Sequence, residues 1–337
     1  MTSREKVRKL FDFAADAVPA FWTGNPHHET YAMYRKELGL DNNEQLFVHL
    51  RDDCRWLAPW GAYKHPEGKP AFDFHGGRPR KSLGDPGVLG DATTIADVEA
   101  IPWPDPAYLD FSETIAAFRE HQHHAIFTGM WCSFFHELHA YFGMEEYFIK
   151  MYTHPEVIEA ATEKIVNFYL VGTEKLFREM GDLADIFFFG NDFGSQLDML
   201  CGPAEFKRFV LPGFTKFIEL AHKYGKKAML HSCGAISKVI PWLIDAGMDG
   251  LHPLQAKAVG MDADTLAREY KGKIVFMGGV DTQHLLIHAT PAQVKDEVRR
   301  IKDILGPHLI VSPSHEAILP NVPLANVIAM AEAAREA

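Results

Sequence analysis

The sequence predicts a single (β/α)8 TIM barrel, in which parallel strands alternate with helices. Two observations favour this fold: short apolar runs alternate with longer amphipathic stretches, and the alternation continues through the C-terminal two-thirds of the chain. The length of 337 residues is compatible with a barrel, which typically needs about 250 residues and more with insertions. A doubly wound open sheet is the alternative, but no Gly-x-Gly-x-x-Gly motif opens a helix after an early strand.

Six apolar runs predict the strands. Each run is short and almost free of charge inside, as expected for parallel strands that are buried on both faces. A series of such units favours a closed barrel over an open sheet. The predicted strands are Ala125–Gly129, Asp185–Gly190, Lys227–His231, Asp249–His252, Ile274–Gly278 and Leu309–Ser312.

The stretches between these runs predict the outer layer of helices. Proline falls near the start of several of them, where its missing N–H group costs little. The predicted helices are Glu145–Met180, Pro203–Tyr224, Ile236–Ala246, Asp262–Tyr270, Pro291–Leu305 and Pro323–Glu336.

The first hundred residues show a weaker pattern. The segment from Trp60 to Pro106 is rich in Gly, Pro and Asp, which predicts an irregular excursion such as a hairpin or a lid. Its composition offers no independent core. We therefore expect one domain over residues 1–337, with residues 1–110 as an N-terminal extension and residues 111–337 as the clearest part of the barrel.

Composition restricts the classes of function. The net charge of −11 disfavours a protein that binds the phosphate backbone of nucleic acid. No stretch approaches the roughly 18 apolar residues of a membrane span, so we expect a cytoplasmic protein that does not bind membranes. The four cysteines are too few and too scattered for a disulfide framework and are expected to be reduced.

The most informative stretch places His231 and Cys233 at the end of a predicted strand, where Gly234 follows them. Carboxyl ends of barrel strands form the catalytic rim. A His-x-Cys pair at such a point suits zinc, although an isolated pair of this kind also occurs through packing around a buried thiol.

A third candidate ligand follows the last predicted strand. His315 lies there, on the same expected rim, and Glu316 beside it is an alternative or additional ligand. Catalytic zinc usually takes three protein ligands and leaves one position open. The competing interpretation is that His315 binds a substrate carboxylate or caps the last helix.

These motifs resemble the uroporphyrinogen decarboxylase-like superfamily. The resemblance rests on HSCG, GMDGLHPLQ, GGVDTQ and SPSHE followed by PNVP, and it covers roughly residues 125–337. Within this superfamily the sequence is most similar to the zinc-containing corrinoid-dependent methyltransferases. That similarity implies zinc ligands at His231 and Cys233, and it places the third ligand, often cysteine in that group, at His315.

The sequence departs from the true decarboxylases near its N-terminus. Their arginine-rich segment, which positions substrate carboxylates, corresponds here to AFWTGNPHHETYAMY at residues 20–34, which contains no arginine. A substrate with eight carboxylates needs bidentate cations. Decarboxylation of a tetrapyrrole without a metal is therefore the second hypothesis.

Other candidates follow from the strand ends. Asp192 is expected to orient the substrate or a histidine ligand, although it can equally cap a loop. Asn191, Asp281 and Gln283 are expected to contact the substrate. Trp131 is expected to line the mouth of the site, and nearby His136 and Glu137 are weaker candidates because helix packing also explains this stretch.

The sequence thus predicts a methyltransferase that uses Zn²⁺ and moves a methyl group between a small methylated substrate or a thiol and a corrinoid (cobalamin). Because the chain carries no corrinoid-binding motif of the usual kind, the corrinoid is expected on a partner protein. His231, Cys233 and His315 are the expected metal ligands, and Asp192 and Glu316 are the expected catalytic residues. A ligand sensor on the same barrel and a homodimeric assembly are further hypotheses.

Overall fold

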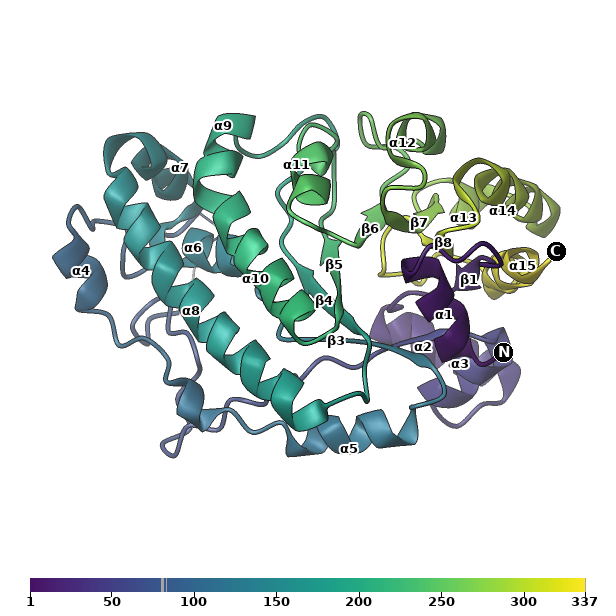
Figure 1. Cartoon of the computed structure of the whole chain (residues 1–337), viewed down its shortest axis with the longest axis horizontal. Coiled ribbons are helices and arrows are strands. Elements are labelled where there is room, and N and C mark those ends of the chain that lie inside the picture. Colours follow the sequence, from purple (N-terminus) through teal and green to yellow (C-terminus); the bar gives the residue numbers. More distant parts are fainter. Residues whose placement is uncertain (80–81, 83, 337) are drawn as a thin grey trace.

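The computed structural model describes residues 1–79, 82 and 84–336, and it contains one sheet of eight parallel strands surrounded by helices (Figure 1). Every strand except the first two coincides with a strand predicted from the sequence. The (β/α)8 fold is therefore confirmed. The strands are β1 (Ala20–Phe21), β2 (Cys54–Trp56), β3 (Ala125–Thr128), β4 (Ile186–Gly190), β5 (Lys227–His231), β6 (Gly250–Leu254), β7 (Val275–Val280) and β8 (Leu309–Pro313).

The strand order is β1-β8-β7-β6-β5-β4-β3-β2, so the sheet curls until β1 and β2 face each other. Few ladder bonds join these two strands. The amide of Asp53 donates to the carbonyl of Phe21 over 2.9 Å, and the Asp53 carboxylate accepts from the Phe21 amide over 3.0 Å. Asp52 accepts from both the amide and the hydroxyl of Thr23. Two aspartates thus close the seam between the first and the second strand.

Alternation along β4 shows how the strands divide the core. Phe188 points into the barrel, where it belongs to the same apolar cluster as Met229 and Met277. Phe187 and Phe189 belong instead to the larger cluster between the sheet and the helices. Both faces of the strand are therefore buried, which explains its unbroken apolar sequence.

Helix α1 (Ser3–Phe11) closes the amino end of the barrel. Its Val7, Leu10 and Phe11 join the interior cluster. The opposite face of the helix carries the cations, and Arg4 pairs over 2.6 Å with Asp185, the residue that precedes β4. The barrel is thus packed at this end, and the carboxyl ends of the strands are left for chemistry.

The helical layer follows the predicted order with local differences. The predicted helix Glu145–Met180 is in fact two helices, because Pro155 starts a new one after a break at His154. The long helices α8 and α10 run side by side in Figure 1. The helices after β2 are α4 (Ile95–Glu99), α5 (Ser112–Glu120), α6 (Phe134–Phe142), α7 (Met144–Thr153), α8 (Pro155–Met180), α9 (Pro203–Glu205), α10 (Leu211–Lys223), α11 (Ile240–Asp245), α12 (Ala263–Tyr270), α13 (Leu285–His288), α14 (Pro291–Leu305) and α15 (Leu324–Arg335), with a 3-10 turn at Pro106–Tyr108 and a π-helical turn at Phe206–Val210.

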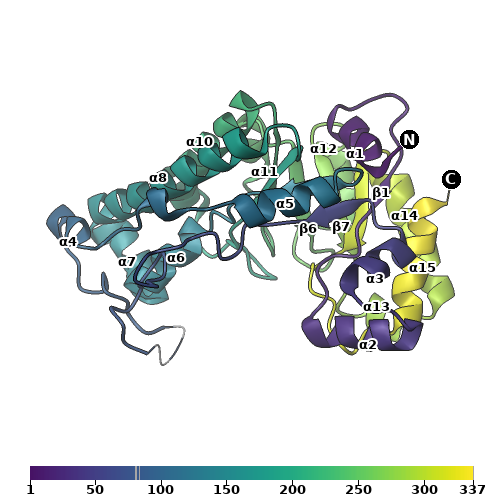
Figure 2. The ribbon, with the colours of Figure 1, turned by 90° about the horizontal axis from the view of Figure 1, so that it is seen from below.

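The two ends of the chain meet on one side of the molecule. Helices α2 (His28–Leu38) and α3 (Asn43–Leu50) gather with α13 and α15 in Figure 2. The hydroxyl of Tyr34 donates to the carbonyl of Val322 over 2.7 Å, and Thr30 donates to the carbonyl of Ile318 over 2.9 Å. The N-terminal residues therefore contribute both strands and helices to the barrel.

The expected excursion between Trp60 and Pro106 contains little regular structure apart from α4. Residues 80, 81 and 83 of this excursion, and residue 337, lie outside the described residues. Among the helices of the described part, none has the length and apolar character needed to cross a membrane.

Candidate active site

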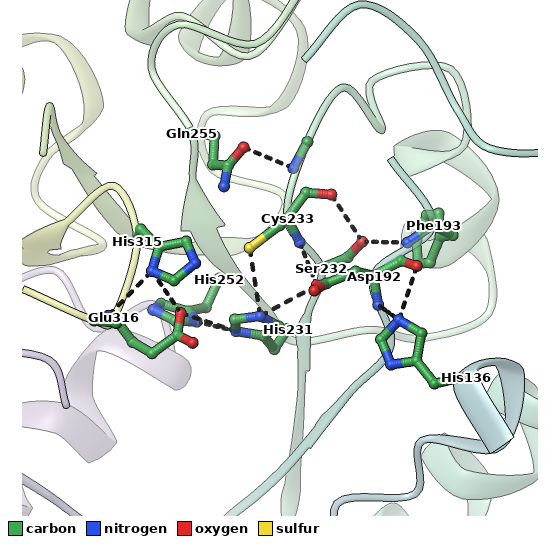
Figure 3. A network of polar contacts seen from close by, with 12 residues as sticks. His136, Asp192, Phe193, His231, Ser232, Cys233, His252, Gln255, His315 and Glu316 are labelled. Atoms are coloured by element: carbon green, nitrogen blue, oxygen red, sulfur yellow. Dashed lines mark hydrogen bonds and ion pairs between the residues drawn. The ribbon is translucent and has the colours of Figure 1, made fainter. Parts of the chain in front are cut away.

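The carboxyl ends of β4, β5, β6 and β8 bring a polar cluster together (Figure 3). His231 is the last residue of β5, and Cys233 follows it by two residues. Asp192 comes two residues after β4, and His315 and Glu316 follow β8. Parallel strands end at the same rim, so residues that are far apart in the sequence lie close together there.

His231 lies at the centre of this cluster and is almost fully buried, with 4% of its surface exposed. Its Nε2 atom lies 3.6 Å from the Cys233 sulfur and 3.3 Å from Asp192 Oδ1. On the other side of the ring, Nδ1 lies 2.9 Å from Nδ1 of His252. If His231 carries its proton on Nδ1 and donates a hydrogen bond to His252, the Nε2 lone pair could bind a metal in place of the contact with Asp192.

Cys233 is positioned by its own backbone. The Cys233 amide donates to Asp192 Oδ1 over 2.8 Å. Gly234 follows with φ +88°, and a Cβ atom at this residue would lie 2.3 Å from the backbone of Gly194. Only glycine allows the two loops to approach this closely. The turn thus directs the thiol toward His231.

His315 and Glu316 complete the cluster from β8. The ligand atoms of Cys233, His315 and Glu316 lie within 4.8 Å of one another, and so do those of His231, His252 and Glu316 and those of Asp192, His231 and Cys233. Within the described part of the chain, the three predicted ligands His231, Cys233 and His315 do not form one such group. The His315 Nδ1 atom accepts a hydrogen bond from the Ala317 amide over 3.1 Å, so the neutral ring carries its proton on Nε2, and binding of a metal would require this hydrogen bond to break. Glu316 Oε2 is buried and accepts no hydrogen bond.

The electrostatics of the cluster favour a cation. Burial, together with the Asp192 and Glu316 carboxylates, raises the pKa of the Cys233 thiol well above its usual value. Burial opposes ionisation of Asp192 as well, but its hydrogen bond with His231 holds its pKa well below the usual range. Among residues 1–79, 82 and 84–336, neither carboxylate forms an ion pair with a lysine or an arginine. The cluster therefore has surplus negative potential that a bound cation would neutralise.

The donor atoms fit zinc. Zn–S and Zn–N bonds of about 2.3 and 2.0–2.1 Å at a tetrahedral angle place the two ligand atoms about 3.6 Å apart. The observed separation of His231 Nε2 and Cys233 Sγ is 3.6 Å. Histidine, thiolate and carboxylate are also the ligand types that zinc accepts.

A polar cavity of about 390 Å³ opens beside His315. Asp281 and Gln283, expected to contact the substrate, both line it. Asp281 Oδ1 accepts from the Gln283 amide over 2.8 Å, and Asp281 Oδ2 lies 3.9 Å from Lys257 Nζ. Asp281 thus both fixes its own loop and contributes to the cavity wall.

Asn191 and Trp131 occupy different environments. Asn191 is fully buried; its side chain accepts from the Phe135 amide and donates to the Cys132 carbonyl, each over 2.9 Å. It therefore fixes the segment that follows β3 rather than facing open space. The Trp131 ring lies 5.2 Å from the His231 ring and lines a second cavity.

His252, which contacts His231, was not among the residues predicted from the sequence. Burial lowers the pKa of His252 well below its usual value, so the ring stays neutral. Its position in a predicted strand next to β5 was the available signal. Gln255 was also missed; it accepts from the Gly234 amide over 3.0 Å and so supports the Cys233 turn.

The comparisons with known proteins agree with the barrel fold. The model of the uroporphyrinogen decarboxylase (URO-D) family matches residues 80–337. The chain belongs to the uroporphyrinogen decarboxylase family. Among solved structures, this family member is similar to a methyltransferase from Methanosarcina mazei, with a TM-score of 0.65 and 15% sequence identity over 99% of this chain and 98% of that one. A search of curated proteins gives no match.

The matched region, residues 80–337, includes all the residues of the polar cluster, from Asp192 to Glu316. The superfamily expected from the sequence motifs is thereby confirmed. The solved structure supports the same barrel over almost the whole length of this uroporphyrinogen decarboxylase family protein.

Proposed function

We propose that this protein is a zinc-dependent methyltransferase that moves a methyl group between a small methylated substrate or a thiol and a corrinoid carried by a partner protein. The observation that carries the proposal is the buried cluster at the barrel rim, where His231 Nε2 and Cys233 Sγ lie 3.6 Å apart. The similarity to a solved methyltransferase supports the choice of reaction.

In this proposal His231, Cys233 and His315 hold the metal. Bound there, zinc would supply Lewis-acid chemistry, either by favouring a thiolate or by stabilising a leaving heteroatom. Two neutral imidazoles and one thiolate leave the site with a formal charge of about +1, which favours activation of the methyl donor. Glu316 is the alternative third ligand, because its buried Oε2 accepts no hydrogen bond.

Other residues around the metal ligands would position them. Asp192 accepts from the Cys233 amide and lies 3.3 Å from His231 Nε2, so it orients both ligands. His252 Nδ1 would accept a hydrogen bond from His231 Nδ1 and so fix that ring. The 390 Å³ cavity beside His315 gives the small substrate or thiol access to the cluster.

Decarboxylation of a tetrapyrrole is less well supported. The walls of the described cavity beside His315 contain Lys257 but no arginine. Arg55, at the seam of the barrel, is engaged by Glu44 over 2.7 Å. A substrate with many carboxylates requires several bidentate cations at the site.

Metal analysis tests the proposal. We expect about one zinc per chain in the native protein, purified without an affinity tag, and loss of zinc in Cys233→Ser and His315→Ala. Cys201→Ser is the matched control, because Cys201 is also free but lies outside the cluster. If His315→Ala keeps zinc and Glu316→Gln loses it, Glu316 is the third ligand. A folded native protein without metal would refute the zinc mechanism and favour decarboxylation.

A further inference from the structure

The loop after β4 forms a short hairpin at the edge of the polar cavity. A β-bridge joins Gly194 to Met199, and Gln196 of the hairpin lines the cavity of about 390 Å³ beside His315. Leu197 follows at the tip and is 78% exposed, more than any other large apolar residue of the described chain. The hairpin therefore presents an apolar side chain to solvent next to the candidate site.

Backbone contacts hold the first half of the hairpin. The Ala235 amide donates to the Ser195 carbonyl over 2.7 Å, and the Val259 amide donates to the Gln196 carbonyl over 3.0 Å. These bonds tie the hairpin to the loops after β5 and β6. Leu197 therefore follows two anchored residues.

Side-chain contacts hold the second half of the hairpin. The Ser195 hydroxyl donates to the Asp198 carbonyl over 2.7 Å, and Lys238 Nζ donates to the two carboxylate oxygens of Asp198 over 2.7 and 2.6 Å. Leu197 thus lies between fixed neighbours. Its exposure is a property of a defined loop that holds the side chain away from the core.

Two further apolar side chains lie near the same opening. Val259, which bonds to the hairpin, is 57% exposed, and Leu319, which lines the cavity, is 51% exposed. With Leu197 they come from the loops after β4, β6 and β8. Single exposed apolar residues are ordinary on protein surfaces, but a group of them around one opening indicates a surface that another molecule covers.

The polar groups at this opening are mostly neutral. Gln283 and Asn321 are both exposed and line the cavity. Among the described residues of its lining, the acidic and basic ones are Asp281 and Lys257, and Lys257 Nζ lies 3.9 Å from Asp281 Oδ2. Their charges offset each other. The opening therefore offers apolar contacts and neutral amides rather than a net charge.

The cavity and its opening suit molecules of different size. A volume of about 390 Å³ accommodates a small molecule. A corrin is a flat macrocycle with methyl groups and primary amides around its edge, and it is too large to enter this cavity. Its ring has to lie across the opening, where methyl groups can meet apolar side chains and amides can meet amides.

We propose that Leu197, Val259 and Leu319, together with the amides of Gln283 and Asn321, form a rim surface that binds the corrin ring carried by the partner protein. This inference rests on the proposed function and deepens it by separating the two substrates. The small molecule occupies the cavity, and the corrin ring covers the opening. Such a cover also excludes water from the polar cluster, which strengthens the electrostatic interactions there.

Equilibrium dialysis of the purified protein against methylcobalamin in the dark tests the inference. The cobalt of this corrinoid carries a methyl group and a base, so histidine side chains do not bind it. We expect saturable binding that Leu197→Asp weakens about tenfold, because the variant removes an apolar contact and places a charge against the corrin edge. Val171→Asp is the matched control. Val171 is 54% exposed on α8, so this variant should bind as tightly as the native protein.

Two results of the dialysis would overturn the proposal. One is equal affinity of Leu197→Asp and Val171→Asp for methylcobalamin. The other is the absence of saturable binding by the native protein up to the solubility of methylcobalamin.

The amides provide an independent check. Gln283→Met and Asn321→Leu keep side chains of similar size but remove the amide groups. Combined in one protein, they should weaken methylcobalamin binding about tenfold, because two hydrogen bonds are lost. Unchanged or tighter binding would show that the amides do not contribute to the rim surface.

A second copy of the chain is the alternative occupant of the rim surface. Size-exclusion chromatography of the native protein and of Leu197→Asp distinguishes the two occupants. We expect the same oligomeric state for both proteins. If Leu197→Asp converts a dimer into a monomer and leaves methylcobalamin affinity unchanged, the rim surface joins two copies of the chain and the assignment is wrong.

One variant separates this inference from the zinc mechanism. Cys233→Ser removes a proposed metal ligand but leaves the rim surface intact, so it should keep the affinity for methylcobalamin. If the native protein binds methylcobalamin through Leu197 but contains no zinc, only the zinc mechanism fails. If it contains zinc but does not bind methylcobalamin, only the rim surface fails.

Discussion

The two ends of β4 carry one aspartate each, and their surroundings differ. Asp185, before the strand, lies 2.6 Å from atoms of both Arg4 and Arg8. Asp192, after the strand, has only His231 as an ion-pair partner among the described residues. The Asp185 side chain is mostly buried and the Asp192 side chain is half-buried. Both carboxylates have lowered pKa values, but fixed positive charges hold only the first.

The two ends of the barrel therefore have different roles: the amino end stabilises the fold, and the carboxyl end forms the candidate site. At the amino end, arginine is always charged, so Asp185 is neutralised permanently and the end stays closed by α1. At the carboxyl end, burial opposes protonation of His231, but its hydrogen bond with Asp192 raises its pKa. Unlike arginine, histidine can lose this proton when a metal binds, so the Asp192 carboxylate stays available for a metal or substrate. The same residue type therefore stabilises the fold at one end and prepares a site at the other.

The largest predicted effect is at Asp192. Asp192→Asn weakens the support of His231 and Cys233, so zinc affinity and methyl-transfer activity should fall about 10–100-fold. Metal titration and transfer to cob(I)alamin would measure both. The melting temperature should change little, and a large loss of stability without loss of metal would contradict the comparison.

Asp185 should give the opposite result. Asp185→Asn leaves Arg4 and Arg8 without their carboxylate, which should lower the free energy of unfolding by about 2 kcal/mol. Urea denaturation would measure this change. Zinc content should remain at the native level, and its loss would show that the two ends are coupled.

Gly190, the last residue of β4, lies against the Trp131 ring. A Cβ atom at this residue would lie 2.3 Å from the Trp131 ring. Gly190→Ala should therefore displace Trp131 and cost about 1–3 kcal/mol of stability. Urea denaturation would measure this change. An unchanged free energy of unfolding would show that the Trp131 ring moves aside without cost.

The smallest expected effect is a pH dependence at the seam. Burial raises the pKa of Asp52 to about 7, and Oδ2 has no hydrogen-bond partner. Between about pH 4 and 7 the unfolded chain releases this proton while the folded chain keeps it. Stability should therefore decline as pH rises through this window.

Asp52→Asn removes this titration. The decline in the free energy of unfolding between pH 4 and 7 should become smaller than in the native protein by at least about 1 kcal/mol. Denaturation at several pH values would measure it. Parallel curves for the two proteins would show that Asp52 ionises alike in both states.

The strands from β3 onward could be predicted because each has at least four consecutive buried residues. The strands β1 and β2 could not be predicted, because they contain only two and three residues and are too short to show an alternation of apolar and polar residues. Their identity depends on pairing with β8 and β3, which are distant in sequence. The break at Pro155 was visible in the sequence, but the apolar pattern continues across it.

The cluster around His231 was largely predictable, because strand ends in a barrel must converge. The sequence therefore predicted Asp192, Cys233, His315 and Glu316 as site residues without any knowledge of the distances between them. Glu137 was only a weak candidate. Its burial depends on contact with Tyr169, which lies on another helix and is not encoded in its local sequence.

The pairing of β1 with β8 also has a consequence for synthesis of the protein. Ala20 pairs with Ile310, so this contact spans most of the chain. A ribosome makes the N-terminal residues first, and they must wait until nearly the whole polypeptide has emerged before the barrel can close. Until then Trp22 and the apolar face of α1 have no permanent partner, and a chaperone would find its target there.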